Sequence, residues 1–174
     1  MEPITQIVGR ALVLHAPDID TDRIVPARFL TRPREAGFGD ALFADWALYP
    51  RDHGCNVLVA GRNFGCGSSR EHAVWALRDA GFRAVLAPQF ADIFRSNALK
   101  NGLLAIECEC DTAAAFVADD EFTIDLDAQT ITRRGHAPIA FRIDPFARHC
   151  LLRGIDELDY LIAHSGVTTA GRFA

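Results

Sequence analysis

The segment from residue 65 to residue 70 brings together backbone flexibility, hydroxyl groups and positive charge: Gly65, Gly67, Ser68, Ser69 and Arg70. Glycine has no Cβ, so the backbone can adopt unusual dihedral angles and a ligand can approach it closely. The two serines stand where a helix is expected to start, and free N–H groups there carry partial positive charge. Arg70 adds a guanidinium that can bind a carboxylate through two hydrogen bonds. The segment therefore predicts an anion-binding loop; the alternative is a tight turn followed by a helix that Ser68 caps.

The flanking sequence predicts a strand–loop–helix–strand unit. Residues 56–60 form a short apolar run typical of a buried strand, and residues 83–87 form a second one. Between them, the spacing of small and apolar residues predicts a helix over Ser69–Ala80, and Gly81 stands where a left-handed C-terminal cap is expected. In such a unit the loop lies at the carboxyl end of a parallel strand, where open α/β sheets bind their ligands.

The remaining elements are predicted from periodicity and from helix-cap and turn residues. Strands are expected at residues 6–15, 103–110, 122–126, 130–133 and 138–143. Helices are expected at residues 38–49, 89–100, 111–119, 144–153 and 155–164, with a frayed tail from about residue 165. A chain of 174 residues that is 49% hydrophobic can bury a full core, so we expect a single domain over residues 1–174.

Charge and composition exclude several classes of protein. A net charge of −5 gives no reason to expect nucleic-acid binding, and no apolar run is long enough to span a membrane. The N-terminus lacks the pattern of a signal peptide, so we expect a cytoplasmic protein. Five cysteines without a secretion signal predict reduced thiols. The pair Cys108 and Cys110 lacks a second pair to complete a zinc site, so buried small residues are the better interpretation.

Two further groups of charged residues could do chemistry. Asp18, Asp20 and Asp22 alternate in a short loop, but the rest of a calcium-binding pattern is absent, and turn and helix-capping roles are the simpler interpretation for Asp20 and Thr21. Arginines follow at positions 28, 32 and 34, close to Pro33 and to glycines at 37 and 39. A loop of this kind can carry specificity, although each arginine alone fits a solvated surface equally well.

The segment Gly61–His72 resembles the hallmark of the small-subunit family of 3-isopropylmalate dehydratases, in the aconitase superfamily. The resemblance extends to Asp18–Pro26, Phe90–Asn97 and Asp144–Cys150, in the family's order. It implies an α/β fold, a three-layer β/β/α swivelling domain that is the counterpart of the mobile C-terminal domain of aconitase. It also implies a larger partner subunit that carries a [4Fe–4S] cluster, whereas this chain shows no set of cluster ligands.

The resemblance implies roles for individual residues. Ser68 matches the catalytic serine, Ser69 a neighbouring contact to an oxyanion or carboxylate, and Arg70 an arginine that binds a substrate carboxylate. Asp22 lies in a Thr–Asp pair that lines the cleft, where its carboxylate is expected to orient an arginine.

A second arginine for the substrate is expected from the following segment, as either Arg28 or Arg34. Cys66 matches the usual residue of the motif, and its thiol could simply fill a small pocket. His72 is expected to have a structural or supporting role, and His149 to form part of a helix face.

The implied reaction is the isomerisation of 2-isopropylmalate to 3-isopropylmalate by loss and return of water, a step of leucine biosynthesis. Related hydro-lyases that act on citraconate, 2-methylmalate or homoaconitate share the scaffold, and the loop over residues 29–38 would decide between them. A non-catalytic module that only holds an anion is the alternative from another class.

Overall fold

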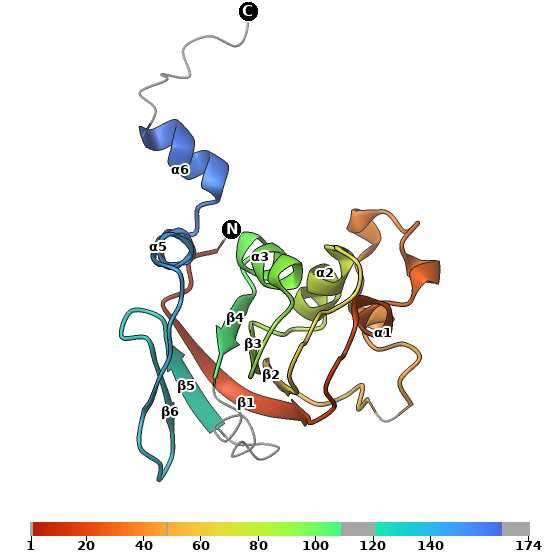
Figure 1. Ribbon diagram of the computed structural model, residues 1–174, viewed down its shortest axis with the longest axis horizontal. Helices are drawn as coiled ribbons and strands as arrows, with labels where there is room; N and C mark the ends of the chain where they lie inside the picture. The colour runs from red at the N-terminus through yellow and green to blue at the C-terminus, as the bar shows by residue number, and fades with distance from the viewer. Residues whose placement is uncertain (1, 48, 109–120, 165–174) are drawn as a thin grey trace, which may run out of the picture.

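The strands of the protein form one mixed sheet in the order β4-β3-β2-β1-β5-β6-β7 (Figure 1). The structure is a computed structural model that describes residues 2–47, 49–108 and 121–164. The strands are β1 (Gln6–Leu14), β2 (Val57–Ala60), β3 (Ala84–Ala87), β4 (Leu104–Glu107), β5 (Glu121–Asp125), β6 (Thr130–Arg133) and β7 (Ile139–Ala140). Strands β1 to β4 run parallel, and β1 also pairs antiparallel with β5, so it belongs to both halves of the sheet.

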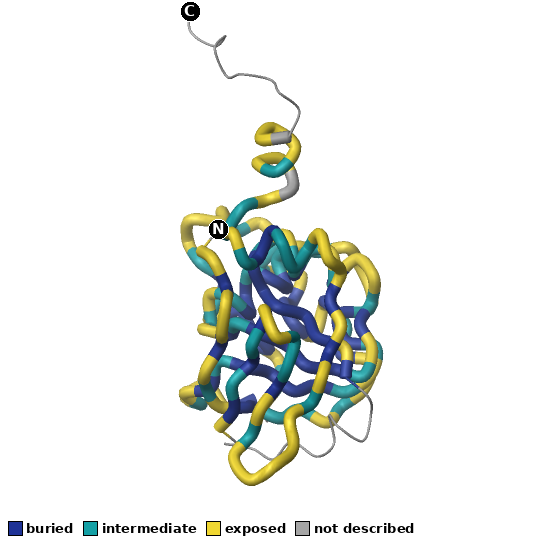
Figure 2. The backbone as a smooth tube through the Cα atoms, turned by 90° about the vertical axis from the view of Figure 1, so that its left-hand side faces the viewer, coloured by how far each residue is buried: buried dark blue, intermediate teal, exposed yellow. Residues whose placement is uncertain are grey.

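Helices cover one face of the parallel half. The helices are α1 (Thr21–Ile24), α2 (His72–Asp79), α3 (Asp92–Lys100), α5 (Pro145–Arg153) and α6 (Glu157–His164). α2 and α3 lie side by side over the parallel strands (Figure 1). Strand β2 divides its side chains by alternation: Leu58 and Ala60 pack toward these helices, whereas Val57 and Val59 pack on the opposite face. The buried strands run through the centre of the molecule (Figure 2).

The opposite face of the parallel half packs against the antiparallel half and α5. Phe122, Ile124 and Ile131 from β5 and β6 share a second core with Val57 and Val59. The helices, the parallel strands and the antiparallel strands therefore stack as three layers with two cores. The predicted hairpin is present, although β7 is shorter than the strand predicted at residues 138–143.

Two predicted helix caps are confirmed. Gly81 has a φ of 96°, and the N–H groups of Gly81 and Phe82 donate to Arg78 O and Leu77 O at 3.0 Å each, which is the Schellman arrangement. At the start of α5, the side chain of Asp144 accepts from the N–H of Ala147 at 2.8 Å, and Pro145 follows in the first turn.

The helix predicted at residues 38–49 is wrong. In its described residues, 38–47 and 49, this segment has only the short 3₁₀ helix Gly39–Ala41 followed by turns. Phe38 and Phe43 are fully buried, so the aromatic pattern reflects the core rather than a helix face. The guanidinium of Arg51 donates to Leu42 O at 2.8 Å and to Phe43 O at 3.2 Å, and so satisfies carbonyls that a helix would otherwise use.

Other boundaries also differ from the predictions. The helix predicted from residue 89 starts at Asp92, and the strand predicted at residues 103–110 ends at Glu107. The helix predicted at residues 111–119, Cys110 and the tail from residue 165 lie outside the described residues. Within the described residues, no helix is long and apolar enough to cross a membrane. α6 extends away from the body, next to α5 (Figures 1 and 2).

Candidate active site

Backbone hydrogen bonds attach the glycine-rich loop to the segment that follows β1. The N–H of Asp18 donates to Arg62 O at 3.0 Å, the N–H of Gly65 to Ile19 O at 2.8 Å, and the N–H of Thr21 to Cys66 O at 2.9 Å. The loop follows β2, and the partner segment follows β1. The sequence therefore predicted correctly that the loop lies at the carboxyl edge of the parallel strands.

Gly65 shows why the loop needs a glycine. Its φ is 76°, and a Cβ at this position would lie 2.2 Å from Cγ of Phe94. Phe94 belongs to α3 and is only 3% exposed, so it has little room to move. The backbone at Gly65 thus passes directly over the ring of Phe94, and Gly67, with a φ of 93°, turns the chain again before Ser68.

The helix after the loop begins later than the sequence predicted. α2 starts at His72 rather than at Ser69, with Glu71 at the N-cap position and no side-chain capping bond there. The N–H of Arg70 donates to Ser68 O at 2.8 Å, which closes a turn before the helix. The expectation that the serines stand at the helix start, with Ser68 as a cap, is therefore wrong, because long-range bonds of the loop and this turn delay the helix.

Ser68 contacts Thr21 instead of a helix end. Its side-chain oxygen lies 3.2 Å from Oγ1 of Thr21, and its carbonyl oxygen accepts from the same Thr21 hydroxyl at 3.1 Å. Ser68 and Ser69 are both exposed, whereas Thr21 is 2% exposed. The serine hydroxyl thus contacts a buried threonine hydroxyl, whereas Ser68 itself is exposed at the surface.

Arg70 is joined to Asp22. Nη1 of Arg70 donates to Oδ1 of Asp22, and the arginine side chain is 23% exposed against 56% for the aspartate. The prediction that Asp22 orients an arginine fits this contact. Ser68, Ser69, Arg70 and Asp22 therefore lie together on one exposed shelf, formed by the loop and α1.

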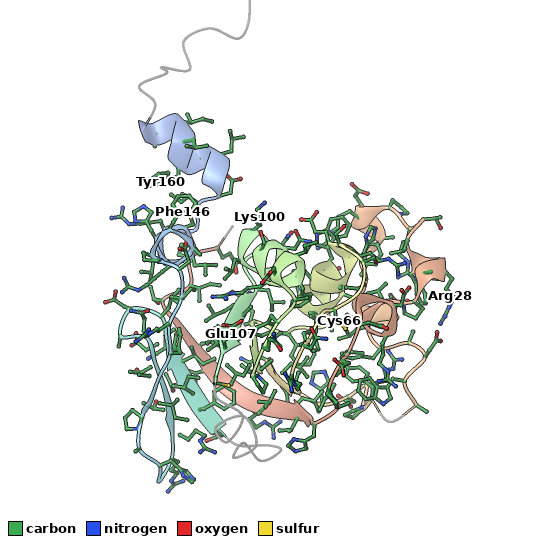
Figure 3. The ribbon with its side chains drawn as sticks, in the orientation of Figure 1. Arg28, Cys66, Lys100, Glu107, Phe146 and Tyr160 are labelled. Carbon is green, nitrogen blue, oxygen red and sulfur yellow. The ribbon has the colours of Figure 1, made fainter. Side chains whose placement is uncertain are left out.

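The two candidate arginines of the next segment are engaged elsewhere. Arg28 forms two hydrogen bonds of 2.7 Å with Asp45, and it lies at the outer rim of the molecule, away from Cys66 of the loop (Figure 3). Arg34 binds Asp79 at 2.7 and 2.9 Å, at the end of α2 opposite to the loop. The structure brings neither arginine to the shelf, and a role in substrate binding stays a prediction for both.

Arg32, which the sequence could not separate from these two, is paired in the same way. Its Nη1 donates to Asp40 at 2.5 Å and to Gly37 O at 3.0 Å. Of the three, Arg34 is the one that pairs with α2, the helix that follows the loop.

Cys66 is a partly buried thiol next to the acidic segment. Burial raises the pKa of Cys66, and the charges of Asp20 and Asp18 raise it further. The thiol therefore stays protonated near neutral pH, which fits a packing role better than that of a nucleophile or metal ligand. Asp20 itself caps α1, since its Oδ1 accepts from the N–H of Arg23 at 2.7 Å.

No group of three or more potential metal ligands comes together among the described residues. The four described cysteines form no disulfide with one another and belong to different parts of the fold: Cys55, Cys66, Cys108 and Cys150. The described residues therefore do not fit an iron–sulfur cluster.

The two histidines lie against aromatic rings. The ring of His72 lies 5.3 Å from Phe38 and 4.7 Å from Trp75, between centroids, and His149 lies 5.4 Å from Tyr160. These contacts agree with the supporting and helix-face roles expected for them.

The shelf is open on this chain. Four surface cavities of the described residues have volumes between about 470 and 730 Å³, and none of them is lined by Ser68, Ser69, Arg70 or Asp22. A serine hydroxyl and an arginine on such a shelf can bind an anion, but an exposed hydroxyl has no means of becoming a base in water. Chemistry at Ser68 needs a second surface that excludes water from the shelf.

The hydroxyl contact between Thr21 and Ser68 is the feature that the sequence did not reveal. Thr21 was assigned to a turn and to a pair lining the cleft, and the residues are separated by 47 positions. Thr21 stands among the charged residues Asp20, Asp22 and Arg23, so the local sequence carries no signal that its side chain is buried.

The fold is similar to that of aconitase C-terminal domains, and the model of that family matches residues 43–110. The aconitase X of Thermococcus kodakaraensis shares the fold, with a TM-score of 0.54 at 14% identity, over 74% of this chain and 89% of that one. A 3-isopropylmalate dehydratase from Methanocaldococcus jannaschii is more similar, with a TM-score of 0.77 at 33% identity, over 92% and 95% of the two chains.

Full-length relatives give the narrower family. The chain is 45% identical to the 3-isopropylmalate dehydratase small subunit of Roseiflexus sp. (strain RS-1), over 98% of this chain and 93% of the relative. It is 48% identical to the protein of the same name from Anaeromyxobacter dehalogenans (strain 2CP-C), over 94% and 93%. The chain belongs to the family of 3-isopropylmalate dehydratase small subunits.

Proposed function

We propose that this chain is the small subunit of a hydro-lyase that converts 2-isopropylmalate into 3-isopropylmalate, a step of leucine biosynthesis. The observation that carries the proposal is the shelf, where the side-chain oxygen of Ser68 contacts the hydroxyl of Thr21 and the guanidinium of Arg70 donates to the carboxylate of Asp22. The family membership given above supports the choice of substrate.

Ser68 is the proposed base. As an alkoxide, its oxygen takes a proton from the substrate carbon beside a carboxylate, and the electron pair of that C–H bond forms a double bond. The substrate hydroxyl takes up a proton and leaves as water, and the water that adds in the second half gives that proton back. Water then adds to the neighbouring carbon, so one water is lost and one is gained over the full isomerisation. The serine returns its proton in the second half, which leaves the enzyme unchanged.

Arg70 and Ser69 are the proposed contacts to the substrate carboxylates. A guanidinium binds a carboxylate through two parallel N–H groups, and Asp22 fixes the plane of the arginine before the substrate arrives. A substrate with two carboxylates needs further positive charge. Arg28 and Arg34 remain the candidates, and either would have to leave its aspartate to reach the shelf.

The open shelf supports dependence on a partner. We infer that a large subunit covers Ser68 and excludes water, because fixed dipoles stabilise an alkoxide strongly only in a dry site. That subunit would carry the [4Fe–4S] cluster, whose open iron supplies a Lewis acid for the substrate hydroxyl.

Reconstitution tests the proposal. The chain is purified alone and together with the large subunit from the same organism, and each preparation is assayed with 2-isopropylmalate, 2-methylmalate and homocitrate. The expected result is turnover of 2-isopropylmalate by the complex and none by the isolated chain. Full turnover by the isolated chain, free of large subunit by mass spectrometry, or a complex that prefers another substrate, would contradict it.

A further inference from the structure

Thr21 is the buried polar residue beneath the shelf. Among the described residues it is the only polar or charged one in the buried class, with 2% exposure. It opens α1, and its N–H donates to Cys66 O at 2.9 Å, two residues before Ser68. A Cβ on Gly67 would lie 3.4 Å from Oγ1 of Thr21, so the loop backbone passes close to this hydroxyl. The position of Thr21 relative to Ser68 is therefore fixed by the backbone.

The hydroxyl of Thr21 has one hydrogen and two acceptors within reach. Oγ1 lies 3.1 Å from the carbonyl oxygen of Ser68 and 3.2 Å from its side-chain oxygen. A threonine hydroxyl can donate only one hydrogen but can accept through two lone pairs. When the hydrogen points to the carbonyl, the hydroxyl of Ser68 must be the donor in the contact between the two side chains.

Loss of the serine proton changes this arrangement. A deprotonated Ser68 has no hydrogen to donate, and a lone pair of Thr21 opposite the alkoxide would be repulsive. Rotation about one bond of Thr21 moves its hydrogen from the carbonyl to the alkoxide. The carbonyl left behind keeps the N–H of Arg70, which donates to it at 2.8 Å, whereas the alkoxide gains the hydroxyl of Thr21 as a donor.

We propose that Thr21 is a positioning residue for Ser68, whose hydroxyl hydrogen rotates from the carbonyl oxygen to the side-chain oxygen of Ser68 when that oxygen is deprotonated. This inference rests on the proposed role of Ser68 as the base. Thr21 acts through Ser68 and touches no substrate. It stabilises the state in which Ser68 is ready to take a proton, with little effect on substrate binding through Arg70.

Matched variants separate the hydroxyl from the methyl group. Thr21→Val keeps the shape and removes the hydroxyl, whereas Thr21→Ser keeps the hydroxyl and removes the methyl. Both are measured in the complex with the large subunit, by kcat, by KM and by the pH dependence of solvent-deuterium exchange at the substrate carbon. The loss of one donor to a developing negative charge typically costs on the order of 10²-fold in rate, so kcat of Thr21→Val is expected to fall by about this factor at unchanged KM.

The pH profile and the rescue exclude a purely structural role. Exchange by Thr21→Val is expected to need higher pH than exchange by the wild type, because the alkoxide has lost a donor. Thr21→Ser is expected to restore most of the rate and the original profile. Equal losses in the Ser and Val variants would show that any change of shape at this position lowers the rate, and would overturn the inference, as would a Thr21→Val complex with wild-type kcat.

A double mutant separates this inference from the proposed function. In a Ser68→Ala background, Thr21→Val should cause no further loss, because Thr21 acts only through Ser68. An additional loss of about 10²-fold there would contradict the positioning role, again on the scale of one lost donor. A wild-type complex that is inactive on 2-isopropylmalate, or a fully active Ser68→Ala complex, would instead overturn the proposed function. If Thr21→Val fails to assemble, the comparison of Thr21→Ser with Thr21→Ala in the same assays decides the question.

Discussion

Arg70 and Asp22 hold the glycine-rich loop and α1 together through a contact between a guanidinium nitrogen and a carboxylate oxygen. The two residues are 48 positions apart, and each comes from a segment that follows a parallel strand. The pair is only partly buried, so its contribution to folding is small. Its main effect is to fix the orientation of the guanidinium on the shelf beside Ser68.

Substitution of Arg70 by lysine is expected to impair the enzyme. Lysine keeps the charge but loses the planar pair of donors, so it cannot hold both Asp22 and a carboxylate in one plane. We expect a loss of about 2–4 kcal/mol of transition-state stabilisation, measured from kcat/KM of the complex. Arg62→Lys, at an exposed position of the same loop, is the control and should stay close to wild type. Wild-type kcat/KM for Arg70→Lys would show that the guanidinium does not meet the substrate.

Gly65 is expected to be far more sensitive to alanine than Gly135, although their φ angles are nearly equal at 76° and 78°. At Gly135 nothing lies within 4 Å of the added Cβ, so only the backbone strain remains. We expect a loss in the free energy of unfolding of about 1–2 kcal/mol for Gly135→Ala. For Gly65→Ala the collision with Phe94 adds about 1–3 kcal/mol. Chemical denaturation of the two variants measures the difference, and equal losses would contradict the close approach.

The stability of the fold is expected to fall as the pH drops below about 6.5, the pKa of an unfolded histidine, in part because of His53. Burial lowers the pKa of His53 in the folded chain, and its Nδ1 accepts from the N–H of Cys55 at 2.9 Å, which requires that nitrogen to be unprotonated. The unfolded chain therefore binds the proton more readily, so the stabilisation present above the unfolded pKa is lost as the pH falls toward the lowered folded pKa.

His53→Gln tests the origin of this pH dependence. The variant has no titrating side chain at position 53, so its free energy of unfolding should change less between pH 7 and pH 5 than that of the wild type. The slope is the relevant measure, because the variant also loses the stacking of His53 on Phe82. Identical slopes for the two proteins would assign the pH dependence to other groups.

The sequence was most informative where local pattern and burial agree. Strand β2 and the cap at Gly81 follow from an apolar run and a glycine, because both depend on neighbours in the chain. The start of α2 does not. Local spacing extended the helix back to Ser69, whereas the loop forms its bonds with Ile19, Thr21 and Gln89, which are remote in sequence.

The segment between Phe38 and Tyr49 shows the same limit. Its aromatic residues recur at helical spacing, but they are buried because Phe43 contacts both Trp46 and Tyr49 in a folded-back turn. A Cβ at Gly39 would lie 2.9 Å from the carbonyl oxygen of Asp79, so this segment packs tightly against the end of α2. Arg28 and Arg34 could be selected as candidates from the family resemblance, but the sequence did not indicate their aspartate partners.

Solvent-deuterium exchange by a Ser68→Ala complex tests the central proposal most directly, because exchange reports removal of the substrate proton without requiring loss of the hydroxyl. Ser68 does not cap α2, so alanine should leave folding, assembly with the large subunit and binding through Arg70 largely intact. The account predicts that exchange at the substrate carbon falls by several orders of magnitude, since the group that takes the proton is gone. Exchange at the wild-type rate, in a complex whose cluster is intact, would show that Ser68 is not the base.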